Sequence, residues 1–239
     1  MSNFDSKFDL AKTQILQQLF AVDPERRDDA WRERFYAAVP DASLVAFEPQ
    51  VEFGPDEFPY FHLAVPEPGP LTPFCVTHAL DYCLEHGCGI AVFADARRAG
   101  PPAWVFSYGD LLSYRLYGRF DGDPSGLDVP AKVPADPDAE RTILRGSPSE
   151  TYLPACARKA IGRFFRDTLK HPDPRITLIA DAQSNPMRRL MVNLTPDHYG
   201  GEADKVRAAL HYTSWFLPAT YRVVSMPPEW SDSDFLPLV

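Results

Sequence analysis

Three features are scarce in this sequence: long apolar runs, cysteine and glycine-rich loops. The longest uninterrupted apolar runs are only a few residues, as in GIAVFA at 89–94, whereas a membrane-spanning helix needs about 20. The start, MSNFDSKFDLAK, has no basic segment followed by an apolar one, so we expect no secretory signal. Four unevenly spaced cysteines among 239 residues do not predict a disulfide framework. These absences favour a reduced, cytoplasmic protein without a membrane partner.

Motifs of several enzyme classes are also absent. The sequence has no G-x-S-x-G elbow, no G-x-x-x-x-G-K-[ST] loop and no H-E-x-x-H pair. Gly87, Gly89 and Gly100 are too far apart for a dinucleotide-binding loop. Nucleophilic catalysis therefore has no local support, and we expect no cofactor.

Positive charge is scarce in the first part of the chain. Residues 1–154 hold 13 Lys and Arg against 24 Asp and Glu, whereas residues 155–239 hold 11 against 9. Because phosphate contact needs clustered positive charge, this acidic protein is not expected to wrap nucleic acid. Arginine outnumbers lysine 18 to 6, a bias that GC-rich coding produces and that hints at a bacterial source.

Apolar spacing predicts short strands beside amphipathic helices in the first 120 residues. Ser6, Thr72 and Asp110 stand at candidate helix starts, and Gly87 at a helix end. The expected helices are 6–20, 28–39, 73–86 and 111–117, and the expected strands are 43–47, 60–65, 90–94 and 104–107.

A proline-rich, acidic stretch then separates a second module with a clearer pattern. Residues 121–153 read as a linker, or as a loop packed on a single domain, with 142–144 as a candidate short strand. Residues 154–239 predict the order α-β-β-α-β: helix 155–170, strands 176–180 and 190–194, helix 202–217 and strand 221–226, followed by an irregular tail. The fold class is therefore α+β, with two sandwich modules that each pack a small mixed sheet against amphipathic helices.

Two stretches carry a resemblance to a known family. They are RERFYAAVPDASLVAF at 32–47 and LPACARKAIGRFFRDTLKHPDPRITLIADAQ at 153–183. In the order of its elements, the chain resembles the bacterial enhanced-serine-sensitivity (SseB-like) proteins. Residues 59–87 depart from that pattern. The resemblance implies a cytoplasmic protein without assigned catalytic residues, so no residue role is carried over.

A basic stripe is the main candidate binding feature. Opposite the phenylalanines of helix 155–170 lie Arg158, Lys159, Arg163, Arg166 and Lys170. Such a stripe can be an ordinary solvated face, or it can dock an acidic protein surface, a phosphorylated ligand, nucleic acid or the acidic first module. Trp215 lies off the apolar stripe of helix 202–217 and is a candidate contact, although packing between the modules would also bury it.

A Cys/His-rich stretch suggests a metal site, but helical geometry weighs against it. Cys75, His78, Cys83 and His86 lie in helix 73–86, with Cys88 just after it. Thiolate and imidazole are natural zinc ligands, yet eleven residues of helix separate the outer pair by about 16 Å. A complete metal site would need His62 or Cys88 to fold back toward this helix from a neighbouring strand.

The sequence favours a non-enzymatic protein that binds another protein as an adaptor, regulator or inhibitor, through the aromatic-rich first module or the basic helix. The alternative is a hydrolase or transferase that uses Asp181, Asp197 and His198, or a metal held by the Cys/His stretch. Turn chemistry alone also explains Asp197. The oligomeric state does not follow from the sequence.

Overall fold

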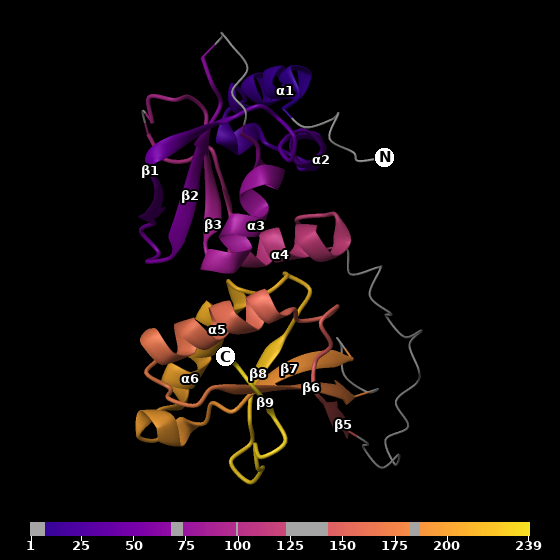
Figure 1. The fold of residues 1–239 in the computed structure, drawn as a ribbon, viewed down its shortest axis with the longest axis vertical. Helices are drawn as coiled ribbons and strands as arrows, with labels where there is room; N and C mark the ends of the chain where they lie inside the picture. Colours follow the sequence, from indigo (N-terminus) through magenta and orange to yellow (C-terminus); the bar gives the residue numbers. More distant parts are fainter. Residues whose placement is uncertain (1–7, 68–73, 99, 123–142, 182–186) are drawn as a thin grey trace. The chain divides into compact units, whose positions relative to one another are not determined.

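The computed structural model describes residues 8–67, 74–98, 100–122, 143–181 and 187–239. The chain divides into two compact units, Met1–Leu111 and Leu112–Val239, and each unit carries one mixed β-sheet (Figure 1). The predicted α+β fold class, with two modules built on sheets, is confirmed. The division falls inside helix α4 (Tyr108–Tyr117), ahead of the predicted linker at 121–153. Residues 123–142 of that linker lie outside the described residues.

Acidic caps begin the first two helices of unit 1. Asp9 accepts hydrogen bonds from the first amides of α1 (Leu10–Phe20), and Asp28 caps α2 (Asp29–Ala38). The short 3₁₀ helix η2 (Pro24–Arg26) joins them. Ser6, the cap predicted for the first helix, lies outside the described residues.

The third helix begins later than its sequence suggests. Helix α3 (Val76–His86) was expected to start at residue 73, but Phe74 forms a β-bridge with Leu44 and keeps the chain extended there. Thr72 lies outside the described residues. Gly87 ends the helix with a φ of 78°, as its position predicts.

Helix α4 uses a different cap from the predicted one. Asp110 lies inside the helix, and its carboxylate accepts from the Ser107 amide at 2.8 Å. In return, the Ser107 hydroxyl accepts from the Asp110 amide at 3.1 Å. This reciprocal pair is a capping box, which moves the helix start back to Tyr108.

The sheet of unit 1 has the order β1-β2-β3-β4. Its strands are β1 (Val45–Phe53), β2 (Pro59–Ala64), β3 (Gly89–Phe93) and β4 (Trp104–Phe106). Strand β1 pairs antiparallel with β2, β2 parallel with β3, and β3 antiparallel with β4. The core lies between this sheet and the helices, where Phe35 stacks on both Trp31 and Phe106, with ring centroids 5.1 and 5.9 Å apart.

Unit 2 contains helices α5 (Ala155–Asp167) and α6 (Ala203–Ser214) and the 3₁₀ helix η3 (Pro196–Tyr199). Its sheet has the order β5-β6-β7-β8, with β9 also paired to β6. The strands are β5 (Ile143–Gly146), β6 (Arg175–Asp181), β7 (Arg188–Val192), β8 (Val223–Ser225) and β9 (Leu236–Pro237). Strand β5 lies inside the predicted linker, and the part of the tail that forms β9 was expected to be irregular.

Both units contain the same sequence of elements. In unit 1 the order is α2-β1-β2-α3-β3, and in unit 2 it is α5-β6-β7-α6-β8. In each case two antiparallel strands are followed by a helix that leads to a third, parallel strand. A parallel pair needs such a crossover, so each helix is placed by the pairing of the strands around it.

The carboxyl-terminal tail completes the core of unit 2 on both sides of its sheet. Phe235 packs against Ile179 and Met191, and Met226 and Trp230 add to this cluster. Beyond it, Leu238 is buried against α5 at Gly162, where an added Cβ would lie 2.5 Å from the Leu238 carbonyl oxygen. Only glycine allows this close approach.

Among the helices that the structure describes, none is long and apolar enough to cross a membrane.

Candidate functional site

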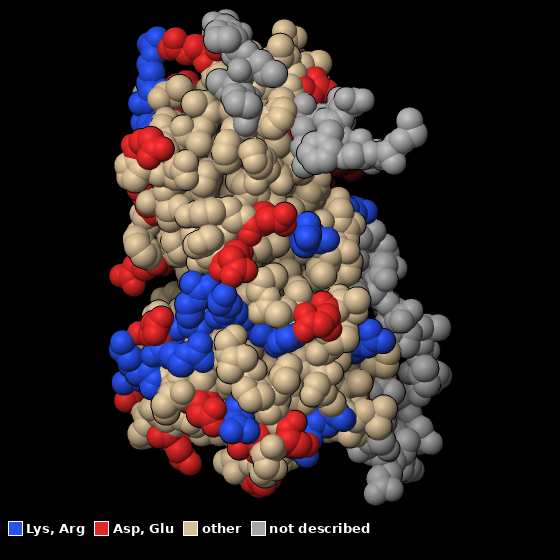
Figure 2. Space-filling view, viewed as in Figure 1, with Lys and Arg blue, Asp and Glu red and all other residues tan. Residues whose placement is uncertain are grey.

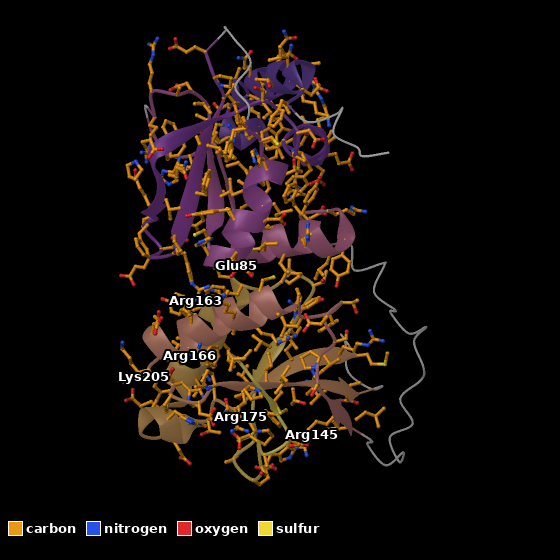
Figure 3. The ribbon with its side chains drawn as sticks, in the orientation of Figure 1. Glu85, Arg145, Arg163, Arg166, Arg175 and Lys205 are labelled. Carbon is orange, nitrogen blue, oxygen red and sulfur yellow. The ribbon has the colours of Figure 1, made fainter. Side chains whose placement is uncertain are left out.

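The predicted binding residues lie on and beside α5 in unit 2. We call Arg158, Lys159, Arg163, Arg166 and Lys170 the α5 basic surface. Figure 2 shows Lys and Arg side chains gathered over α5 and α6, and Figure 3 places Arg163 and Arg166 along α5. The buried stripe of α5, which includes Ile161 and Phe165, faces the core as predicted.

Arg158 has a structural role within this surface. Its guanidinium pairs with Glu150 and donates a 2.7 Å hydrogen bond to the Leu153 carbonyl, and its side chain is only 15% exposed. Glu150 also accepts from the Ala155 amide at 2.9 Å. The hydrogen bond from Arg158, helped by that amide, holds the pKa of the Glu150 carboxyl below its usual value. Arg158 therefore fixes the segment that leads into α5 and is not available to a partner.

Arg166 and Lys170 keep their charge uncompensated. Arg166 donates to the Leu238 carbonyl oxygen, and Lys170 Nζ donates to the Asp167 carbonyl oxygen at 2.6 Å. Across the described ranges neither side chain forms an ion pair with a carboxylate. A carbonyl satisfies a donor without cancelling a full charge, so both cations can still attract an anionic group.

Lys170 does not belong to the helix, contrary to the prediction of a helix over 155–170. Helix α5 ends at Asp167, and Lys170 takes a φ of 57° in the turn that follows. Its ammonium group caps a carbonyl near the helix end, where positive charge is favourable. Lys159 is exposed on α5, and Arg163 is half-buried.

Trp215 is joined to α5 through two phenylalanine rings. Its ring lies 4.8 Å from Phe216, and Phe216 lies 5.1 Å from Phe164 of α5. Trp215 and Phe164 are both half-buried, whereas Phe216 is buried. Trp215 is thus connected to the phenylalanine side of α5, whereas Arg166 lies about 160° around the helix from Phe164.

The residues of the alternative catalytic hypothesis are not brought together. Asp181 ends β6, is 1% exposed and lies 3.6 Å from Arg189. His198 lies at the other end of that strand. Its ring contacts His171, and His171 hydrogen-bonds to Asn193. The Asn193 amide donates in turn to the carbonyl of Arg175, the first residue of β6. Seven strand residues separate the two ends by about 20 Å. Asp181 therefore cannot act with Asp197 and His198 on one bond.

His198 instead stabilises a turn beside a buried histidine. Its Nδ1 accepts from the Thr195 amide at 3.1 Å, as part of a capping box in η3. His171 is 4% exposed, and its Nε2 lies 2.9 Å from Asn193 Oδ1. Burial lowers the pKa of His171, which favours the neutral ring.

The Cys/His stretch does not form a metal site among the residues that the structure describes. Cys75, Cys83 and Cys88 are buried, and burial raises the pKa of the Cys83 thiol. His78 stacks on Phe74 and His86 stacks on Tyr82, with centroids 4.8 and 4.1 Å apart. The thiols belong to the apolar core, and the imidazoles pack against aromatic rings.

His62, the other residue considered for metal, belongs to a polar cluster that the sequence did not reveal. Arg98 donates to both carboxylate oxygens of Glu52 at 2.8 and 3.0 Å and to His62 Nδ1 at 2.8 Å. A guanidinium can only donate, so His62 Nδ1 accepts and the proton of the neutral ring lies on Nε2. Burial, followed by the Arg98 charge, lowers the pKa of His62. Phe47 and Phe93 flank the guanidinium at 4.9 and 5.1 Å.

This cluster fixes the connection between β3 and β4 to the sheet. Arg98 adopts a φ of 53°, which is unusual for a residue other than glycine, and its three hydrogen bonds offset that cost. Its residues come from β1, β2 and the connection after β3, so no local pattern could have predicted it.

Comparison of the chain with protein-family models, with curated proteins and with solved structures found no match.

Proposed function

We propose that this protein is a cytoplasmic bacterial protein that binds another protein and does not catalyse a reaction. It would act as an adaptor, regulator or inhibitor through Trp215 and the α5 basic surface, with Arg158 in a structural role there. The observation that carries the proposal is the uncompensated charge of Arg166, on α5, and of Lys170, in the turn that follows it. The resemblance to SseB-like proteins in element order favours the same reading.

The combination of arginine, lysine and half-buried aromatic rings is suited to an acidic protein surface. Tryptophan and arginine are enriched at protein interfaces, and uncompensated cations speed association with a negatively charged partner. A partner that reaches both the cations and Trp215 would combine electrostatic attraction with apolar burial.

The test is affinity capture from an extract of the source organism with three forms of the full chain. The double variant Lys159→Glu and Lys170→Glu reverses two exposed charges of the α5 basic surface. The matched control, Lys205→Glu and Arg207→Glu, reverses two exposed charges on α6 that already pair with Glu202 and Asp204. We expect the first variant to lose the partner and the control to retain it.

Thermal unfolding of the same proteins separates binding from folding. Exposed substitutions of this kind change stability by about 0.5 kcal/mol or less. Unchanged capture by the first variant would make the α5 basic surface an ordinary solvated face. A large loss of stability in that variant would instead assign the surface a structural role.

A further inference from the structure

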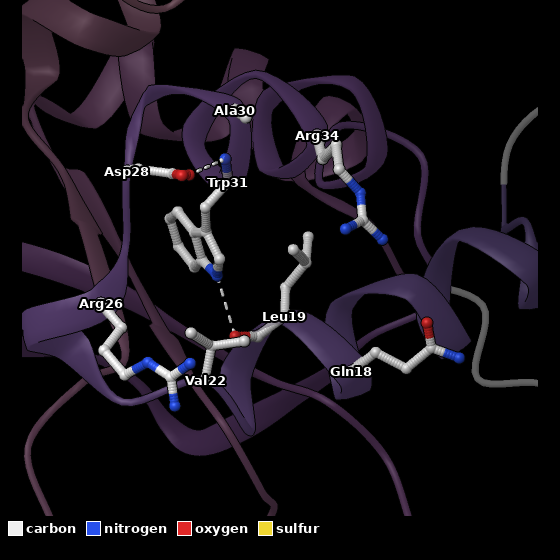
Figure 4. Close-up of a pocket in the computed structure, with 8 residues that line it drawn as sticks. All are labelled: Gln18, Leu19, Val22, Arg26, Asp28, Ala30, Trp31 and Arg34. Carbon is white, nitrogen blue, oxygen red and sulfur yellow. Dashed lines mark hydrogen bonds between the residues drawn. The ribbon is translucent and has the colours of Figure 1, made fainter.

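A cavity of about 370 Å³ opens between α1, η2 and α2 in unit 1 (Figure 4). Apolar atoms of Leu19, Val22 and Trp31 line it. Trp31 is 5% exposed, and its indole N–H donates to the Leu19 carbonyl at 2.9 Å. The hydrogen bond fixes the ring and uses its polar atom, so the cavity has a preformed apolar floor. Its volume lies near the lower end of the range for ligand sites.

Two arginines lie on either side of this floor. Arg26 comes from η2 and Arg34 from α2, and Figure 4 shows Leu19, Val22 and Trp31 between them. Within the described ranges, neither guanidinium forms a hydrogen bond or an ion pair. Two exposed guanidinium groups beside an apolar floor are therefore available to a ligand.

The neighbouring arginines differ from this pair because they have partners. Arg32 pairs with Asp29, at 2.5 Å, and Arg27 donates to the Val22 and Ala103 carbonyls and lies 4.8 Å from the Trp31 ring. Arg27 and Arg32 thus contact other groups of the fold, whereas Arg26 and Arg34 form no hydrogen bond or ion pair among the described residues.

Asp28 is the acidic residue that lines the cavity, and it is already engaged. Its carboxylate accepts from the Trp31 amide at 2.8 Å and caps α2. The positive end of the helix dipole offsets part of its charge. The lining therefore keeps an excess of positive charge, and the Gln18 amide adds a neutral polar group.

We propose that this cavity binds an acidic peptide segment of a partner protein, in which an apolar side chain lies between two carboxylates. The apolar side chain would cover Trp31, Leu19 and Val22, and the carboxylates would pair with Arg26 and Arg34. The planar guanidinium matches a carboxylate through two parallel hydrogen bonds. None of the lining residues belongs to the α5 basic surface, so a failure of one proposal would not refute the other.

The test follows the Trp31 indole N–H signal by NMR in the full-length ¹⁵N-labelled protein, with Trp31→Phe to identify it. Three capped peptides serve as probes: Glu-Gly-Leu-Gly-Glu, the same peptide with Gln for both Glu, and the same peptide with Ser for Leu. We expect saturable shifts at millimolar concentrations of the first peptide. The other two should bind more weakly, because each lacks one of the two recognised groups.

Arginine variants test the charge contribution directly. Arg26→Gln and Arg34→Gln should each weaken binding about two- to fivefold, the effect of a solvent-exposed ion pair. The control Arg32→Gln, on the same helix and outside the lining, should leave the affinity unchanged.

Three results would overturn the proposal. The first is the absence of a Trp31 shift with the acidic peptide, and the second is equal binding by the double Arg26→Gln, Arg34→Gln variant. The third is that 3-phenylpropionate or inorganic phosphate binds as tightly as the peptide, which would make the cavity a small-molecule or simple anion site.

Discussion

Replacing Gly162 with alanine would place a methyl group where the last residues of the chain already lie. The added Cβ would be 2.5 Å from the Leu238 carbonyl oxygen, 2.9 Å from its carbonyl carbon and 3.1 Å from its Cβ. The obstacle is mainly backbone, so no side-chain rotation removes the clash. Either α5 or the tail that carries β9 must move.

The expected loss follows from what that movement breaks. Overpacking of a buried contact costs about 1–3 kcal/mol. Complete release of the tail would expose the Leu238 side chain, now 1% exposed, at a cost of about 1.5–3 kcal/mol. It would also break the hydrogen bond from Arg166 to the Leu238 carbonyl. The better helix propensity of alanine returns about 0.5–1 kcal/mol. The free energy of unfolding of unit 2 should therefore fall by about 1–3 kcal/mol.

Urea unfolding followed by circular dichroism and tryptophan fluorescence measures this difference, with the transitions of the two units fitted separately. Gly146→Ala is the matched control, because a Cβ there would meet nothing within 4 Å. We expect the control to be as stable as the wild type or slightly more stable. A Gly162→Ala variant that matches or exceeds the wild type would contradict the packing of the tail on α5.

Three further predictions concern groups outside this contact. Unit 2 should lose stability as the pH falls below about 6.5, because the pKa of the buried His171 is lowered and the unfolded chain therefore takes up a proton there first. The groups around this ring are His198, Asn193, Asp173 and Asp232. His171→Gln should flatten the dependence of the melting temperature on pH between 7.5 and 5. Glu52→Gln should lower the free energy of unfolding of unit 1 in urea, because it removes the ion pair with Arg98; Arg98→Gln should lower it further, because that change also removes the hydrogen bond to His62. Of the four thiols, Cys156 should react first with a bulky disulfide reagent in the folded protein, because it is half-buried while the other three are buried; rapid reaction of Cys83 would contradict the packing of α3.

Local patterns predicted most elements of both units. The apolar stripe of α5 at i, i+4 and i+8 and the glycine after α3 depend on neighbours within about two helical turns. Such features depend little on the rest of the fold, so the sequence alone indicates them.

The differences arise where contacts between distant residues decide the structure. Phe74 pairs with Leu44 and delays α3, and β9 pairs with β6 across some sixty residues. Neither partner can be recognised from its own neighbours. The antiparallel pairing of β6 and β7 likewise separates Asp181 from His198, although the two residues lie close in sequence.

The candidate site also combines features that local spacing predicts with features that depend on distant contacts. Helical periodicity placed Arg158, Arg163 and Arg166 on one side of α5, but the state of each cation depends on tertiary neighbours. Glu150 engages Arg158, whereas Arg166 meets only the Leu238 carbonyl. The Arg98 cluster and the Trp31 cavity combine residues from three elements each, which no spacing rule detects.

The affinity of the captured partner for the charge-reversed proteins shows whether the α5 basic surface forms the interface. The dissociation constant is measured for the wild type, for Lys159→Glu with Lys170→Glu, and for Lys205→Glu with Arg207→Glu, at low and at physiological salt. We expect the affinity to fall about tenfold or more for the α5 variant, with a larger loss at low salt, and to change about twofold or less for the α6 control. Equal dissociation constants for all three proteins would contradict this expectation.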